Sequence, residues 1–159
     1  MPQIDFKRLS RLMLIYRVVQ AVLLALLIYV ALNFQQHFVL KNRPDQFFKS
    51  ILIAVVLQLI IIYPVYKLAW RDAGVEIDGS VSDLTGEQLT ALRKKRLLGD
   101  LWKFCGVAFF VVFVLMVPSA DKAAGVTLVL ASTLFSFLLT CLMYFQCFNF
   151  SAKKRMKAN

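Results

Sequence analysis

Reactive and metal-binding side chains are scarce in this sequence of 159 residues. It has one histidine, His37, and three cysteines, with no C-x-x-C pair and no spacing typical of a zinc site. The sequence also lacks a Walker A loop, a G-x-G-x-x-G motif and a nucleophile paired with a base. We therefore predict no enzyme activity, no metal site and no bound cofactor.

Acidic residues are also few, nine against nineteen lysines and arginines, which gives a formal net charge of +10. None of the nine lies in the middle of a long apolar block, whereas an ion-coupled carrier usually needs a carboxylate or a broken helix there. The basic residues flank the apolar blocks, so orientation in a bilayer and attraction to anionic lipid explain them. We expect no nucleic-acid partner.

Apolar residues make up 60% of the chain, more than the roughly 45–50% of a soluble domain. They gather in four blocks, each near the roughly 20 residues that cross a bilayer as a helix. We therefore predict an all-α polytopic membrane protein, with four transmembrane helices in an up-down-up-down arrangement. The predicted domain is 1–159, with spans at about 12–33, 47–69, 101–117 and 124–150.

The longest hydrophilic segment is a predicted cytoplasmic loop at 71–100. Its first part, 72–80, is acidic and contains glycine, which indicates irregular structure. Thr85 and Gln88 then match a capping box and predict a short amphipathic helix with a basic end, which could continue into the third span.

Two shorter connections are predicted outside the cytoplasm. The first, 35–46, contains the turn-forming residues 42–45, and the second is a tight turn that begins at Pro118. Fifteen of the nineteen lysines and arginines lie at the chain ends or around the segment 71–100, and four lie in or beside these connections. This bias predicts that both termini are cytoplasmic.

Two residues of the first two spans are candidates for a structural or a functional role. Arg17 is the deepest charge of the first span. It either snorkels toward the cytoplasmic head groups or marks a site within the membrane. Pro64, near the end of the second span, is expected to kink that helix.

Polar side chains in the second and fourth spans suggest either helix packing or a solute pathway. Gln58 lies near the middle of the second span and is expected either to hydrogen-bond to another helix or to contact a solute. The fourth span carries hydroxyl groups at every fourth position, Ser132, Ser136 and Thr140. This narrow face either lets a helix approach closely or, with Gln58 and Tyr63, contributes to a pathway.

Two basic clusters are predicted to dock anionic lipid or an acidic protein partner. One lies in the central segment and one near the C-terminus: Arg93, Lys94, Lys95, Arg96, Lys153, Lys154 and Arg155.

Three features give the chain a family resemblance: the basic start, Pro64 with Leu68-Ala-Trp-Arg71 closing the second span, and Gly99-Asp-Leu-Trp-Lys103 opening the third. In these features it resembles the ATP synthase protein I family, small four-span proteins of the bacterial inner membrane. Its central segment is longer, and its second span lacks glycine. The resemblance implies an accessory role in assembling the membrane rotor of the ATP synthase, with magnesium handling also suggested, and makes 99–103 the first positions to test.

Together these observations favour a non-enzymatic accessory, scaffold or assembly protein of a larger membrane complex, in the bacterial inner (plasma) membrane. Its expected partners are anionic lipid, membrane-protein subunits and, as a homo-oligomer, further copies of itself. The alternative function is a small oligomeric transporter or channel.

Overall fold

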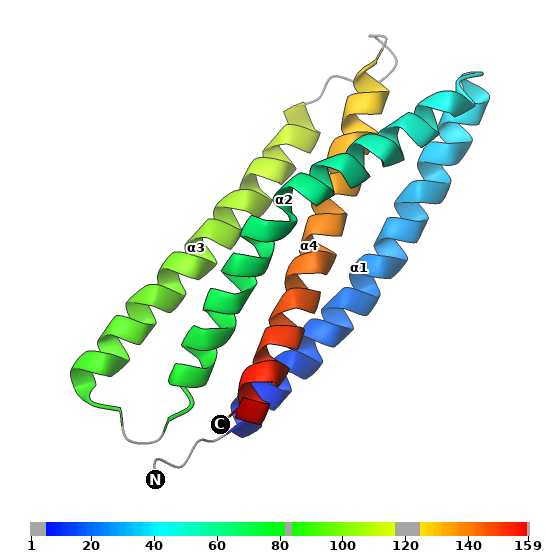
Figure 1. Cartoon of the computed structure of the whole chain (residues 1–159). Coiled ribbons are helices and arrows are strands. Elements are labelled where there is room, and N and C mark those ends of the chain that lie inside the picture. Colours follow the sequence, from blue (N-terminus) through cyan, green and yellow to red (C-terminus); the bar gives the residue numbers. More distant parts are fainter. Residues whose placement is uncertain (1–5, 82–83, 117–124, 159) are drawn as a thin grey trace.

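The computed structural model describes residues 6–81, 84–116 and 125–158. Over these residues the chain forms four helices, α1 (Phe6–Leu40), α2 (Pro44–Asp78), α3 (Gly86–Met116) and α4 (Val126–Ala158). Successive helices run in opposite directions (Figure 1). The start of α1, the ends of α2 and α4 and the start of α3 therefore lie together, at what we call the charged end. The all-helical prediction is confirmed.

Three of these helices are long and apolar enough to cross a membrane: Lys7–Leu40, Pro44–Asp78 and Val126–Lys157. They contain the predicted first and second spans and nearly all of the fourth. The described part of α3 does not meet the same criterion. The span at 101–117 therefore stays a prediction, and its last residue lies outside the described part of the chain.

The first helix is longer than predicted, because 35–40 continue α1 instead of forming a loop. His37 is in the last turn of α1, and the neighbouring Phe38 is 1% exposed. Phe38 belongs to an apolar cluster with Ala54 of α2 and Phe135 of α4. Packing of this aromatic side chain holds the polar end of α1 helical, which the polarity of the segment did not indicate.

The turn between α1 and α2 lies within the predicted turn at 42–45. Asn42 has a positive φ of 54°, a conformation that asparagine tolerates better than most residues. Its N–H donates to Val39 O at 3.0 Å, and the Arg43 N–H donates to Phe38 O at 2.9 Å. These two bonds close the end of α1 as a Schellman motif. Pro44 then opens α2, where a missing N–H costs nothing.

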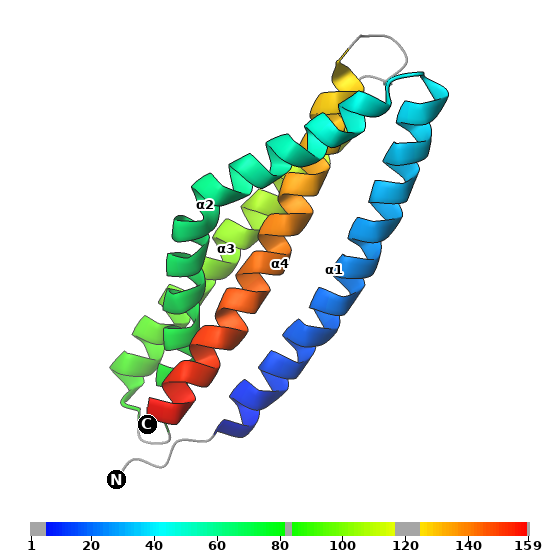
Figure 2. The same ribbon diagram turned by 45° about the vertical axis from the view of Figure 1, so that its right-hand side comes forward.

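The second helix also corrects the sequence analysis, since 72–78 are helical rather than irregular. Ala73 and Ile77 are 0% and 5% exposed and belong to an apolar cluster with residues of α1 and α4. This burial offsets the roughly 1 kcal/mol that Gly74 costs within a helix. Pro64 lies inside α2, whose ribbon bends along its length (Figure 2).

The third helix joins two segments that were predicted separately. The basic amphipathic segment and the third apolar block form one continuous helix, which is the continuation that the sequence left open. Before this helix, the Thr85 N–H donates to Gln88 Oε1 at 3.2 Å, which is one half of the predicted capping box. The predicted turn beginning at Pro118 lies outside the described residues.

Helix α4 packs most extensively against α2 and then against α1, whereas α3 lies mainly beside α2 (Figures 1 and 2). Small residues allow the close approach of α2 and α4, since Ala69 and Ala152 are both 0% exposed. Phe148 fills the same core at 1% exposure. The outer faces remain apolar, as Leu14, Leu59 and similar side chains are exposed.

Candidate functional site

Two carboxylates of α2 extend toward α3 at the charged end. Asp72 and Glu76 are one helical turn apart, so both lie on the same side of α2. The Asp72 carboxylate accepts a hydrogen bond from the Tyr144 hydroxyl at 2.6 Å. It also pairs with the Lys103 ammonium at 3.0 Å, and its own side chain is only 11% exposed. One acidic side chain therefore contacts both α3 and α4.

Glu76 forms a second ion pair between the same helices. The Arg96 Nε donates to Glu76 Oε1 at 2.7 Å, and a second guanidinium nitrogen donates to the other carboxylate oxygen. Two parallel bonds fix the orientation of both side chains as well as their separation. We call Asp72, Glu76, Arg96, Lys103 and Tyr144 the charged cluster.

A glycine of α3 permits this close approach. A Cβ atom at Gly99 would lie 3.3 Å from Asp72 Oδ1 and 3.4 Å from an Arg71 nitrogen. The first residue of the segment 99–103 is therefore a contact point with α2, and the last, Lys103, is an ion-pair partner. The charged cluster can fasten α3 to α2 and α4, because its two half-buried ion pairs join α2 to α3 and the Tyr144 hydroxyl joins Asp72 to α4.

The basic residues predicted to dock lipid or a partner divide into two groups. Arg96 is engaged with Glu76, and Arg155 lies over the Trp70 ring at 4.4 Å and against Gly74. Lys154 also lies over Trp70, at 5.7 Å, although it is exposed. The remaining four residues are exposed: Arg93, Lys94, Lys95 and Lys153. Their docking role stays a prediction.

Gln58 and Thr140 are brought together between α2 and α4. The Thr140 hydroxyl lies 3.2 Å from Gln58 Oε1 and 2.7 Å from Ser136 O. The Gln58 Nε2 lies 3.2 Å from Met143 Sδ. Ser132 instead donates within α4, to Leu128 O at 2.8 Å. The geometry of Gln58 is that of a contact between helices.

The other pathway candidates do not meet Gln58. The Tyr63 side chain is 69% exposed, and Pro64 is exposed beside it. Arg17 is exposed and borders a surface hollow of about 450 Å³ together with Lys7 and Arg11. The structure therefore places Tyr63 and Arg17 on the outside of the bundle.

A set of amides between α1 and α4 was missed by the sequence analysis. Gln20 Nε2 donates to Gln146 Oε1 at 3.0 Å, and Asn149 Nδ2 donates to Gln20 Oε1 at 3.2 Å. A usable signal was present, because each of these amides lies within a predicted span and needs a partner there. The three residues form a second polar contact between helices.

Among the described residues, no group of three or more His, Cys, Asp or Glu side chains could hold a metal ion. In comparisons with protein-family models, curated proteins and solved structures, none matched the chain.

Proposed function

We propose that the chain is a non-enzymatic scaffold or assembly protein with four membrane spans, α3 supplying the one at 101–117. The supporting observation is the contrast between the two sides of its helices. Large apolar side chains such as Leu59, at 67% exposed, face outward. Inward polar groups such as Gln58 and Asp72 contact other helices. Such a bundle offers apolar surfaces to partner helices and to lipid.

The proposed orientation places the charged end in the cytoplasm. It contains the starts of α1 and α3 and the ends of α2 and α4, where most lysines and arginines lie. Trp70 and Trp102 border the segment 71–100, which the proposal places in the cytoplasm, and tryptophan is enriched at membrane interfaces. A bacterial inner membrane is the proposed location, following the resemblance to the ATP synthase protein I family.

Helix α3 is the proposed partner-binding helix. Its contacts with the other helices are fewer than those of α1, α2 or α4. It also exposes large aromatic side chains: Trp102 (70%) and Phe109 (74%) are seven positions apart and share one face, and Phe104 (70%) lies on another. Aromatic residues of this size dominate many protein interfaces. The membrane rotor of an ATP synthase is the first partner complex to test.

The experiment combines site-specific cross-linking with deletion. A photo-reactive amino acid at Phe109 is expected to cross-link, in intact cells, to one subunit of a membrane complex. Leu59 of α2 is a matched lipid-facing control, because it is also exposed at 67%. Loss of the chain is expected to lower the amount of that complex after mild detergent extraction. A chain recovered alone, without loss of any complex on deletion, would contradict the proposal.

A flux assay separates this proposal from the alternative function. The purified chain is reconstituted into liposomes, and ion flux is compared with that of the Gln58→Leu variant. We expect no flux above that of empty liposomes. A flux that depends on Gln58 would favour a transporter or channel instead.

A further inference from the structure

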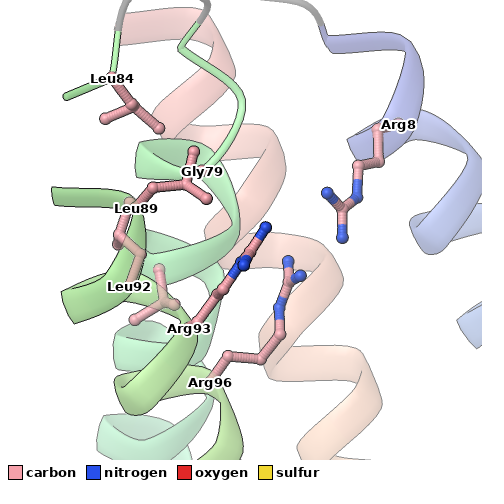
Figure 3. Close-up of a pocket in the computed structure, with 8 residues that line it drawn as sticks. Arg8, Gly79, Leu84, Leu89, Leu92, Arg93 and Arg96 are labelled. Atoms are coloured by element: carbon pink, nitrogen blue, oxygen red, sulfur yellow. The ribbon is translucent and has the colours of Figure 1, made fainter. Parts of the chain in front are cut away.

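Three arginines from two helices surround a hollow at the charged end. The hollow has a volume of about 230 Å³ and is lined by Arg8 of α1 and by Arg93 and Arg96 of α3. Figure 3 shows their guanidinium groups pointing into the same space, with Leu89 and Leu92 on the other side. Arg8 is far in sequence from Arg93 and Arg96, so the fold itself brings it to them.

The charges of this hollow are only partly neutralised. Arg96 is paired with Glu76. Arg8 and Arg93 are exposed, and within the described residues neither has an ion-pair partner. Like charges that converge repel one another, and a bound anion would relieve this repulsion. The planar guanidinium group also matches the oxygen atoms of a phosphate, to which it can donate two parallel hydrogen bonds.

A second hollow continues from the first along α1. It measures about 360 Å³ and shares Arg8 and Arg96 with the first hollow. Leu12 and Ile15 line it as well, at four and seven positions beyond Arg8, so they lie on the same face of α1. Along α1, the residues that line the second hollow therefore change from basic, at Arg8 and Arg11, to apolar, at Leu12 and Ile15.

The carboxylates that line the second hollow do not outweigh the positive charge of the arginines. Glu76 is engaged by Arg96, and the Asp100 carboxylate lies 3.4 Å from the Lys103 ammonium. Across both hollows, four arginines face two carboxylates, with Arg11 as the fourth. A ligand with an anionic head and an apolar tail would match this arrangement.

We infer that the two hollows bind one anionic phospholipid. Arg8 and Arg93 hold the phosphate of its head group, and Leu12 and Ile15 contact the start of its acyl chains. This inference rests on one part of the proposed function, the orientation of the chain in the membrane, because the charged end must lie at the level of the lipid head groups. It does not depend on the scaffold role.

The test measures lipid binding by the purified full chain in a neutral detergent. Phosphatidylglycerol or phosphatidylcholine is added, and the lipid retained is followed by native mass spectrometry. We expect tighter binding of phosphatidylglycerol. The affinity of the double variant Arg8→Gln/Arg93→Gln for phosphatidylglycerol is expected to be about tenfold lower or more, since each basic residue near an anionic head group contributes about 1 kcal/mol.

A matched control removes the same charge elsewhere. Lys67→Gln/Lys157→Gln changes two exposed residues of α2 and α4 that belong to neither predicted docking cluster and line neither of the two hollows. This variant is expected to retain the affinity of the wild type. An equal loss in both double variants would overturn the inference, because it would indicate general attraction between charges. The double variant Arg8→Lys/Arg93→Lys keeps both positive charges but not the planar guanidinium groups. Its affinity for phosphatidylglycerol is expected to lie between those of the wild type and the glutamine variant.

Two further measurements distinguish a lipid phosphate from free phosphate and keep the test valid if a variant misfolds. Inorganic phosphate, titrated in the same detergent, is expected to compete only weakly. Arginine-dependent binding of inorganic phosphate without binding of phosphatidylglycerol would overturn the lipid assignment. If the glutamine variant fails to fold, the lysine variant carries the test, and unchanged affinity there would count against the inference. The cross-linking experiment at Phe109 is independent of these outcomes.

Discussion

Helix α2 contacts its two neighbours through different chemistry. Toward α4 it presents small apolar side chains such as Ala69 and Ala73, which are completely buried. Toward α3 it presents the carboxylates of Asp72 and Glu76, which pair with Lys103 and Arg96. The first interface depends on many weak contacts spread along the helices. The second depends on a few ion pairs.

This difference predicts that α3 separates from the bundle more easily than α2 and α4 separate from each other. Close packing between α2 and α4 should resist the loss of any single charge. The attachment of α3 should weaken when one member of the charged cluster is changed, because removal of a partner leaves a partly buried charge without compensation. A loosely attached α3 would also be the helix most able to adjust to a partner.

The largest expected effect concerns the apolar interface. Phe148→Ala removes a side chain that is 1% exposed, and should lower the free energy of unfolding by about 3 kcal/mol. The matched change Phe109→Ala removes the same atoms from a side chain that is 74% exposed, and should have little effect. Denaturant unfolding in detergent measures both variants. Equal losses would contradict the assignment of the core to α1, α2 and α4.

The next effect concerns the charged cluster. Asp72→Asn weakens the contacts with Lys103 and Tyr144, and should lower the free energy that holds α3 against the other helices by about 2 kcal/mol. Hydrogen exchange is expected to increase in α3 but not in α1 or α4. Asp45→Asn is the control, because its ion pair with Lys49 lies at the exposed start of α2. Unchanged exchange in α3 would show that the charged cluster does not hold it.

A smaller effect is expected at the glycine of the α2–α3 contact. Gly99→Leu places a side chain against Asp72 and should separate the helices at a cost of about 1 kcal/mol. Gly106→Leu is the control on the same helix, since a Cβ there meets nothing within 4 Å. Spin labels at Lys67 and Phe104 report the distance between α2 and α3. The same distance in both variants would argue against close approach at Gly99.

The smallest effect concerns the contact between Gln58 and Thr140. A bond of this kind between membrane helices contributes about 0.6 kcal/mol on average, so Gln58→Leu should cost about that amount. A double-mutant cycle with Thr140→Val isolates the pairwise contribution. Additive losses in the cycle would show that the two side chains are not coupled.

The sequence predicted well the three helices that are long and apolar enough to cross a membrane, because long apolar blocks favour helix formation by themselves. It failed where a helix continues into polar sequence. Residues 72–78 and 35–40 contain charged or polar residues, yet Ala73 and Phe38 pack against other helices. Such contacts join residues distant in the chain and leave no periodic local signal. Helix ends were therefore the least predictable part of the fold.

The candidate site was only partly predictable for a related reason. The basic residues of α3 were evident from their clustering, but their partners were not. Glu76 was assigned to an irregular segment, so its pairing with Arg96 was not anticipated. The hollow between Arg8 and Arg93 depends on how α1 and α3 are arranged in space, which no local pattern specifies.

The most direct test of the account is the side of the membrane on which the charged end lies. After replacement of Cys105, Cys141 and Cys147, single cysteines are introduced at Lys94 and at Asn42, which is in the turn between α1 and α2. In intact cells, a membrane-impermeant maleimide should label the cysteine at position 42 and leave the one at 94 unmodified until the membrane is opened. Labelling of position 94 from outside would contradict the proposed topology.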